Sequence, residues 1–117
     1  MILKFDEIEV SHMPNFKGGE KEFAANMFFD GTNRIFKGCL VPGASIGLHT
    51  HEDSCEVIFV LGGKGCIYEK GPQDAELKCS KVIAGECIYC PKGHTHSLVN
   101  PEGSQEDLVF YAVVPLQ

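Results

Sequence analysis

The chain has 117 residues, a length that typically forms one domain. Hydrophobic residues make up 44% of the chain and charged residues 22%, which indicates a soluble globular protein with a real core. The formal net charge of −6 argues against binding to nucleic acid or to anionic lipid, because both require a basic face. The N-terminal stretch MILKFDEIEV lacks the apolar run of a signal peptide, and no window is long enough to span a membrane. We therefore expect a cytoplasmic protein.

Residues 1–33 carry the weakest structural signals in the chain. The only helix candidates are FDEIEV at residues 5–10 and GEKEFAANMF at residues 19–28, and both are short. We expect this N-terminal segment to supply extra strands or a short helix to the domain that follows. It is also our candidate for a dimer contact.

Residues 34–117 are divided into short runs rich in β-branched and aromatic residues. The runs are RIFKGCLV, CEVIFVL, KGCIYEK, CIYC, HSLVN and DLVFYAVV. They are separated by turn signals such as VPGAS, LGGKG, EKGPQDAE and NPEGSQED. This rhythm predicts a single all-β domain of the sandwich, jelly-roll or barrel type.

The stretch HTHEDSCE at residues 49–56 holds two histidines and three carboxylates next to an apolar run. On a strand, His49 and His51 would leave the same face because they are two residues apart. The following residues, EDSC, have the length of a hairpin loop, which predicts that Glu56 lies opposite His51 on the next strand. Glu52 and Asp53 would then form the solvated tip of the hairpin. Such a cluster on the wall of a barrel would bind a metal ion. The alternative is a solvated loop that binds no metal.

Two stretches together favour the metal site: GASIGLHTHEDSCEVIFVLGG and GECIYCPKGHTHSLVN. The defining residues of the first are Gly43, His49, His51, Glu56 and Gly63, and those of the second are Gly85, Pro91, Gly93, His96 and Asn100. Their order and spacing match the two sequence motifs of the cupin superfamily at every defining position. Over about residues 34–114 the chain resembles the small single-domain cupins. A solvated loop would leave His96 and the matching glycines unexplained.

The resemblance implies a double-stranded β-helix of jelly-roll type that forms a homodimer. It also implies one divalent transition metal per chain, with His49, His51, Glu56 and His96 as ligands. Three imidazoles and one carboxylate suit Mn, Fe, Ni, Co or Zn, and are too rich in nitrogen for Ca or Mg. Four protein ligands on a six-coordinate metal leave two positions open for substrate or oxygen.

Three further residues are candidates for catalysis or ligand binding, each with a simpler alternative. Arg34 is the only arginine, and it would bind the carboxylate of a substrate through two hydrogen bonds if it faced the metal. The alternative is that Arg34 is a surface residue after the DGTN turn. His94 shares strand parity with His96 and would transfer protons at the barrel mouth, or is an exposed turn residue. Tyr68 would offer an inward hydroxyl, or lies at a barrel edge.

The six cysteines are expected to be free thiols, as is usual in a cytosolic protein. Cys87 and Cys90 form a C-x-x-C motif, which in other contexts marks zinc or redox sites. Within the strand CIYC these two side chains would point to opposite faces and could not chelate together. We therefore assign both thiols to packing.

These features predict a metal-dependent protein with a small, mainly apolar pocket that admits a molecule of about a dozen heavy atoms or fewer. We expect the barrel interior to be lined by Phe36, Leu40, Ile58, Val60, Leu98, Phe110 and Ala112, which leaves this small pocket. The leading hypothesis is an enzyme of the dioxygenase, isomerase or decarboxylase type acting on a keto acid, dicarboxylate or sugar derivative. The alternative is a module that binds or senses such a molecule without turnover. The ligand set fixes neither the metal nor the reaction.

Overall fold

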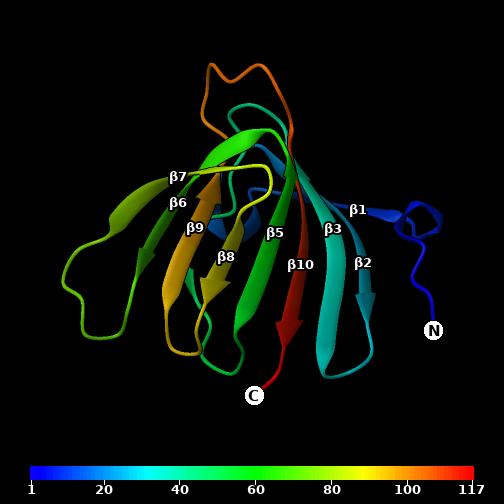
Figure 1. Ribbon diagram of the computed structural model, residues 1–117, viewed down its shortest axis with the longest axis horizontal. Helices are drawn as coiled ribbons and strands as arrows, with labels where there is room; N and C mark the ends of the chain where they lie inside the picture. Colours follow the sequence, from blue (N-terminus) through cyan, green and yellow to red (C-terminus); the bar gives the residue numbers. More distant parts are fainter.

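A computed structural model describes all 117 residues as two antiparallel sheets that face each other (Figure 1). In chain order the strands are β1 (Val10–Pro14), β2 (Glu22–Phe29), β3 (Asn33–Leu40), β4 (His49–Thr50), β5 (Glu56–Gly62), β6 (Lys64–Lys70), β7 (Lys78–Ile83), β8 (Cys87–Cys90), β9 (Thr95–Val99) and β10 (Leu108–Pro115). One sheet has the order β1-β2-β3-β10-β5-β8 and the other β4-β9-β6-β7. This architecture confirms the predicted all-β fold and single domain.

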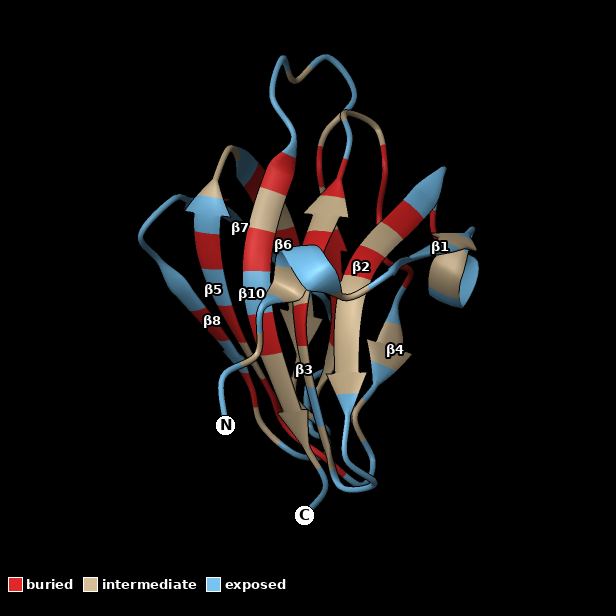
Figure 2. Ribbon diagram, turned by 90° about the vertical axis from the view of Figure 1, so that its right-hand side faces the viewer, coloured by how far each residue is buried: buried red, intermediate tan, exposed pale blue.

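The core lies between the two sheets and follows from alternating burial along the strands (Figure 2). In β5, for example, Ile58 and Val60 are buried whereas Phe59 and Leu61 are exposed. Successive side chains of a strand point to opposite faces, so one face of each strand builds the core. All seven residues predicted to line the interior are buried, and all of them belong to strands of the two facing sheets.

Residues 1–33 contribute two strands rather than a long helix. The helix candidate at residues 19–28 forms β2, because Phe23 and Ala25 alternate inward and are 1% exposed. The candidate at residues 5–10 contains only the single 3-10 turn η1 (Phe5–Glu7). A second such turn, η2 (Phe16–Gly18), joins β1 to β2. Because Phe23 and Ala25 pack in the main core, the N-terminal segment shares that core with residues 34–117.

The structure bears on the expected role of the cysteines. All six cysteines are free. Cys87 is exposed and Cys90 is buried, which confirms that the two side chains of the C-x-x-C motif lie on opposite faces of β8. Burial raises the pKa of the Cys90 thiol to about 12, so this cysteine stays protonated and packs as an apolar group. Neither 3-10 turn has the length or hydropathy of a membrane-spanning helix.

Candidate metal centre

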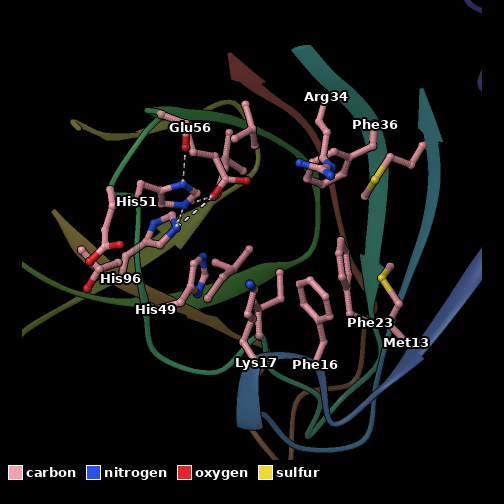
Figure 3. A pocket seen from close by; sticks show the side chains of 18 of the residues that line it. Met13, Phe16, Lys17, Phe23, Arg34, Phe36, His49, His51, Glu56 and His96 are labelled. Carbon is pink, nitrogen blue, oxygen red and sulfur yellow. Dashed lines mark hydrogen bonds and ion pairs between the residues drawn. The ribbon is translucent and has the colours of Figure 1, made fainter. Parts of the chain in front are cut away.

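Four side chains from both sheets converge at one end of the space between them (Figure 3). His49 in β4 and His96 in β9 are direct cross-strand partners in the four-stranded sheet. Glu56 is the first residue of β5 in the six-stranded sheet, and His51 lies in the connection between β4 and β5. The potential ligand atoms of these four residues all lie within 4.8 Å of one another.

The predicted hairpin between His51 and Glu56 is wrong. β4 pairs with β9, whereas β5 pairs with β10 and β8, so the residues between them cross from one sheet to the other. The crossing segment is anchored by the buried Cys55 and by a bridge between Ser54 and Leu116. Glu56 therefore faces the histidines across the barrel interior instead of beside them. As predicted, His96 comes from a third strand.

Short polar contacts hold the four side chains together. The Oε1 atom of Glu56 lies 2.9 Å from Nε2 of His96 and 3.2 Å from Nε2 of His51. The two Nε2 atoms are themselves 3.0 Å apart. His49 completes the group, with its ring centroid 4.9 Å from that of His51 and 4.8 Å from that of His96. Three imidazoles around one carboxylate form a compact set of nitrogen and oxygen donors.

In all three imidazoles Nε2 is turned toward the cluster or free to bind a metal, and the surroundings of Nδ1 differ. Nδ1 of His49 donates to the carbonyl oxygen of Gly47 at 2.7 Å, which leaves the Nε2 lone pair free. Nδ1 of His51 lies 3.0 Å from the hydroxyl of Ser54. Nδ1 of His96 is buried without a hydrogen-bond partner. Such outer hydrogen bonds set the tautomer and orientation of histidines that bind metals.

The charge states of the site suit a cation. Burial acts to raise the pKa of Glu56, but hydrogen bonds and charges from His51 and His96 outweigh it and hold this pKa at about 2. Burial is the main cause that lowers the pKa of His49, which favours its neutral form. An ionised carboxylate and a neutral imidazole are the forms that coordinate metals.

The four residues form one end of a cavity of about 620 Å³. Figure 3 shows His49, His51, Glu56 and His96 on one side of this cavity, and Met13, Phe16, Phe23 and Phe36 on the other. Arg34 and Lys17 also line it, and neither forms an ion pair with a carboxylate. The guanidinium of Arg34 lies over the ring of Phe29, 4.4 Å from its centroid. Two cations without carboxylate partners therefore border the cavity.

Of the three further candidates, only Arg34 lines the cavity. The ring of His94 lies beside Gly71 and Asp74, away from the metal cluster, and its backbone carbonyl accepts a hydrogen bond from His51 N at 3.0 Å. Tyr68 is on the outer face of β6 and is 37% exposed. The structure thus places His94 in the turn before β9 and Tyr68 outside the barrel.

The sequence did not point to the residues at the opposite end of the cavity. Met13, Phe16, Lys17 and Met27 belong to β1, η2 and β2, and no motif marks them. The sequence feature in this region that carries structural information is Gly19. The structure shows why the residue is a glycine, because a β-carbon there would collide with the carbonyl oxygen of Ser45. Such a glycine indicates close approach of two backbones, but not which side chains this approach brings together.

Comparison with known proteins agrees with this geometry. The profile of the cupin domain family matches residues 36–114, which include all four clustered residues and both motifs. The chain therefore belongs to the cupin family, and its two-sheet barrel is the cupin fold.

Three individual proteins of known sequence or structure resemble the chain. The chain is 30% identical to an oxalate-binding protein from Thermotoga maritima over 99% of its own length and 94% of the relative's. A solved structure described as a predicted oxalate decarboxylase from Thermotoga maritima superposes with a TM-score of 0.85 at 28% identity, over the full length of both chains. The cupin domain of Cnp3 from Schizosaccharomyces pombe matches with a TM-score of 0.72 at 11% identity, over 100% of this chain and 74% of that one. The last likeness shows the fold alone.

Proposed function

We propose that His49, His51, Glu56 and His96 bind one divalent transition metal. The convergence of three imidazoles and a carboxylate within 4.8 Å carries this proposal. The donor set fits the ion, because neutral imidazoles and an ionised carboxylate suit Mn, Fe, Co, Ni or Zn. Burial of Glu56 and His96, 6% and 2% exposed, shields the site from competing water. The buried Nδ1 of His96, which has no partner, leaves its Nε2 as the nitrogen turned to the cluster.

The ligand that we propose for this metal is a small carboxylate. Arg34 lines the same cavity as the metal cluster and has no carboxylate partner within the chain. A guanidinium binds carboxylates through two parallel hydrogen bonds, so Arg34 would orient such a ligand. The similarity to an oxalate-binding protein over nearly the full chain supports this class of ligand.

We propose further that the protein acts on this ligand as an enzyme of the decarboxylase, dioxygenase or isomerase type. A bound divalent metal supplies Lewis-acid stabilisation of negative charge on the oxygens of a ligand. In this chain Arg34 would position the carboxylate. Glu52 and Asp53 line the cavity and are exposed, so they would exchange protons with solvent near the ligand. The likeness to a predicted oxalate decarboxylase supports the first of the three reaction types.

Binding without turnover is the second candidate, and the composition of the cavity wall favours it. Apart from the metal cluster, the wall contains no histidine, tyrosine or cysteine. Histidine transfers protons most often near neutral pH, and every histidine of this cavity already belongs to the metal cluster. The name of the relative, an oxalate-binding protein, describes binding and no reaction.

Titration calorimetry with oxalate and metal-loaded protein tests the proposal, followed by product analysis of the same mixture. Binding with release of formate and carbon dioxide would establish the enzyme. Binding with oxalate and simple keto acids all recovered intact, both with and without oxygen, would establish the binding protein. If oxalate and simple keto acids all fail to bind the metal-loaded protein, the proposed function is wrong.

We propose that the protein is a homodimer, with the outer face of the six-stranded sheet as the contact in preference to the N-terminal segment suggested by the sequence. Phe59, Leu61, Tyr89 and Tyr111 are between 39% and 60% exposed, and Phe59 pairs directly with Tyr111 across two adjacent strands. A contiguous exposed apolar surface of this kind marks interaction sites. Light scattering after size-exclusion chromatography should give twice the mass of one chain for the native protein. The Phe59→Lys variant should give the mass of one chain.

A further inference from the structure

The cavity that contains the metal cluster has a second, apolar end that a molecule the size of oxalate would leave empty. Its volume of about 620 Å³ lies well inside the range of ~300–1,000 Å³ found for sites that bind drug-sized ligands. Met13, Phe16, Phe23 and Met27, all from the N-terminal third, line this end. Figure 3 shows Met13, Phe16 and Phe23 across the cavity from the histidines. The metal ligands thus use only one end.

Contacts within the chain hold the apolar wall in place. The carbonyl oxygen of Phe16 accepts a hydrogen bond from Gly47 N at 3.0 Å, and the ring of Phe16 lies 5.4 Å from that of Phe23. Gly47 also accepts the hydrogen bond from Nδ1 of His49. One residue therefore ties the apolar wall to a metal ligand, so the two ends of the cavity hold a fixed spacing.

The side chains of the apolar wall keep accessible surface that a ligand can bury. Met13, Phe16, Met27 and Val114 are only partly buried where they pack against the core. Contact with apolar atoms would remove this surface from water, which favours binding. The two methionines have flexible, polarisable side chains that adapt to ligands of different shapes.

Charge and surface together specify the ligand. The metal cluster favours a carboxylate with a neighbouring oxygen at one end of the cavity, and the wall of methionine and phenylalanine favours an apolar group at the other. Arg34, which Figure 3 shows beside Phe36, adds a positive charge to the same cavity. We infer that the natural ligand is an amphipathic 2-oxo or 2-hydroxy acid with an aliphatic or aromatic side chain, rather than oxalate itself. This inference rests on the proposed binding of a carboxylate to the metal and specifies the other end of the ligand.

A series of 2-oxo acids tests the inference on the metal-loaded protein. Pyruvate, 2-oxobutanoate, 2-oxohexanoate and phenylpyruvate would be titrated by calorimetry, with oxalate as the reference. Each methylene buried by the apolar wall strengthens binding by about threefold to fourfold. We expect 2-oxohexanoate and phenylpyruvate to bind at least tenfold more tightly than pyruvate.

Two matched variants test whether the tighter binding of the longer acids comes from the apolar wall. Met27→Gln keeps the length of the side chain but makes it polar, and should reduce the ratio of affinities between 2-oxohexanoate and pyruvate. Leu77→Gln makes the same kind of change at an exposed position outside the cavity and should leave that ratio as in the native protein.

The outcomes separate this inference from the proposed function. If oxalate and pyruvate bind and the longer acids bind no better, the inference is overturned while metal-dependent carboxylate binding stands. If the longer acids bind better and Met27→Gln retains the full gain, the apolar end is not the site of the side chain, which also overturns it. If no acid binds at all, the proposed function itself is wrong.

Discussion

The two ends of the cavity are built in different ways. At the metal end, His51, Glu56 and His96 contact one another at 2.9 to 3.2 Å, and the ring of His49 packs against both of the other imidazoles. The apolar end consists of side chains from β1, η2 and β2 that lie across the cavity from the cluster, and all of them except the buried Phe23 are only partly buried. The metal end can therefore determine the chemistry, whereas the apolar end can determine which ligand is held there.

The bounds of the family profile follow the same division. The cupin profile covers residues 36–114, which include the metal end and exclude Met13, Phe16, Lys17 and Met27. The predictions that follow probe the two ends separately.

Acid should destabilise the metal-free protein through the metal end. The pKa of Glu56 is about 2 in the folded state and 4.5 when exposed, so its contribution is present above pH 4.5 and is lost as the pH falls toward 2. The difference corresponds to about 3 kcal/mol. The lowered pKa of His49 acts in the same direction, beginning as the pH falls below 6.5. Urea unfolding of chelator-treated protein at several pH values measures both effects.

Glu56→Gln isolates the lower of these two pH ranges. The variant should lose the pH dependence between 4.5 and 2 and retain the dependence that begins below 6.5, since His49 is unchanged. Parallel stability curves for the native protein and Glu56→Gln below pH 4.5 would contradict the assigned charge state of Glu56.

Removal of the metal should abolish carboxylate binding even though the apolar end remains intact. Arg34 is exposed, and an exposed cation alone binds a carboxylate weakly. We expect the affinity for oxalate to fall by about 100-fold or more, equivalent to about 2.8 kcal/mol. Calorimetry before and after chelation, and again after metal is restored, gives the comparison. Equal affinity of the metal-free protein would show that the carboxylate does not bind the metal.

Gly47→Ala should disturb the contact between the two ends. A β-carbon at this position would collide with the carbonyl oxygen of Lys17, which belongs to the backbone and cannot rotate away. Overpacking of this kind costs about 2 kcal/mol in the free energy of unfolding. Gly62→Ala is the control, because its β-carbon would meet no atom within 4 Å and its φ is ordinary. Equal stability of both variants would contradict the close packing of η2 against Gly47.

Arg34→Gln should weaken carboxylate binding by about tenfold, equivalent to about 1.4 kcal/mol, the smallest effect of the four. A hydrogen bond to a charged group is worth roughly 1.5–3 kcal/mol, and the exposure of Arg34 keeps its contribution at the lower limit. Metal content should not change, since Arg34 does not belong to the four clustered residues. Lys37→Gln serves as the control: Lys37 lies on the same strand but faces Asp6 at 3.8 Å, outside the cavity. A similar loss in both variants would indicate a general effect of net charge.

The sequence predicted most strands of residues 34–117 from local patterns, and the resemblance to the family motifs predicted the four clustered residues. It missed β7, whose side chains are exposed except for Val82, so that no run of apolar residues marks this strand. Asn100 shows why the motifs are informative beyond the ligands. It is fully buried, and its side-chain amide donates to the carbonyl oxygens of Leu40 at 2.8 Å and Glu106 at 2.9 Å. Gly93 has a φ of 87°, which glycine adopts without strain in the turn before β9. Both residues fix the position of the strand that carries His96.

The sequence could not give the partners of β4 or the apolar end of the cavity. The loop between His51 and Glu56 has a length that suits a hairpin, and only the pairing of β4 with β9 shows that it crosses between sheets. Lys17 reaches the cavity because η2 adopts an unusual backbone, with a φ of 57° at Lys17 itself. Such a conformation depends on long-range contacts, and a local pattern of residues does not encode it.

The central claim is that the four clustered residues hold a metal, and metal content measured by mass spectrometry tests it most directly. Untagged native protein and His12→Ala should each contain one equivalent of a divalent transition metal, because His12 lies outside the cavity in contact with Glu22. His96→Ala should contain none, since it removes the most deeply buried histidine of the cluster. A native protein without metal after reconstitution, or a His96→Ala variant that retains a full equivalent, would contradict the account.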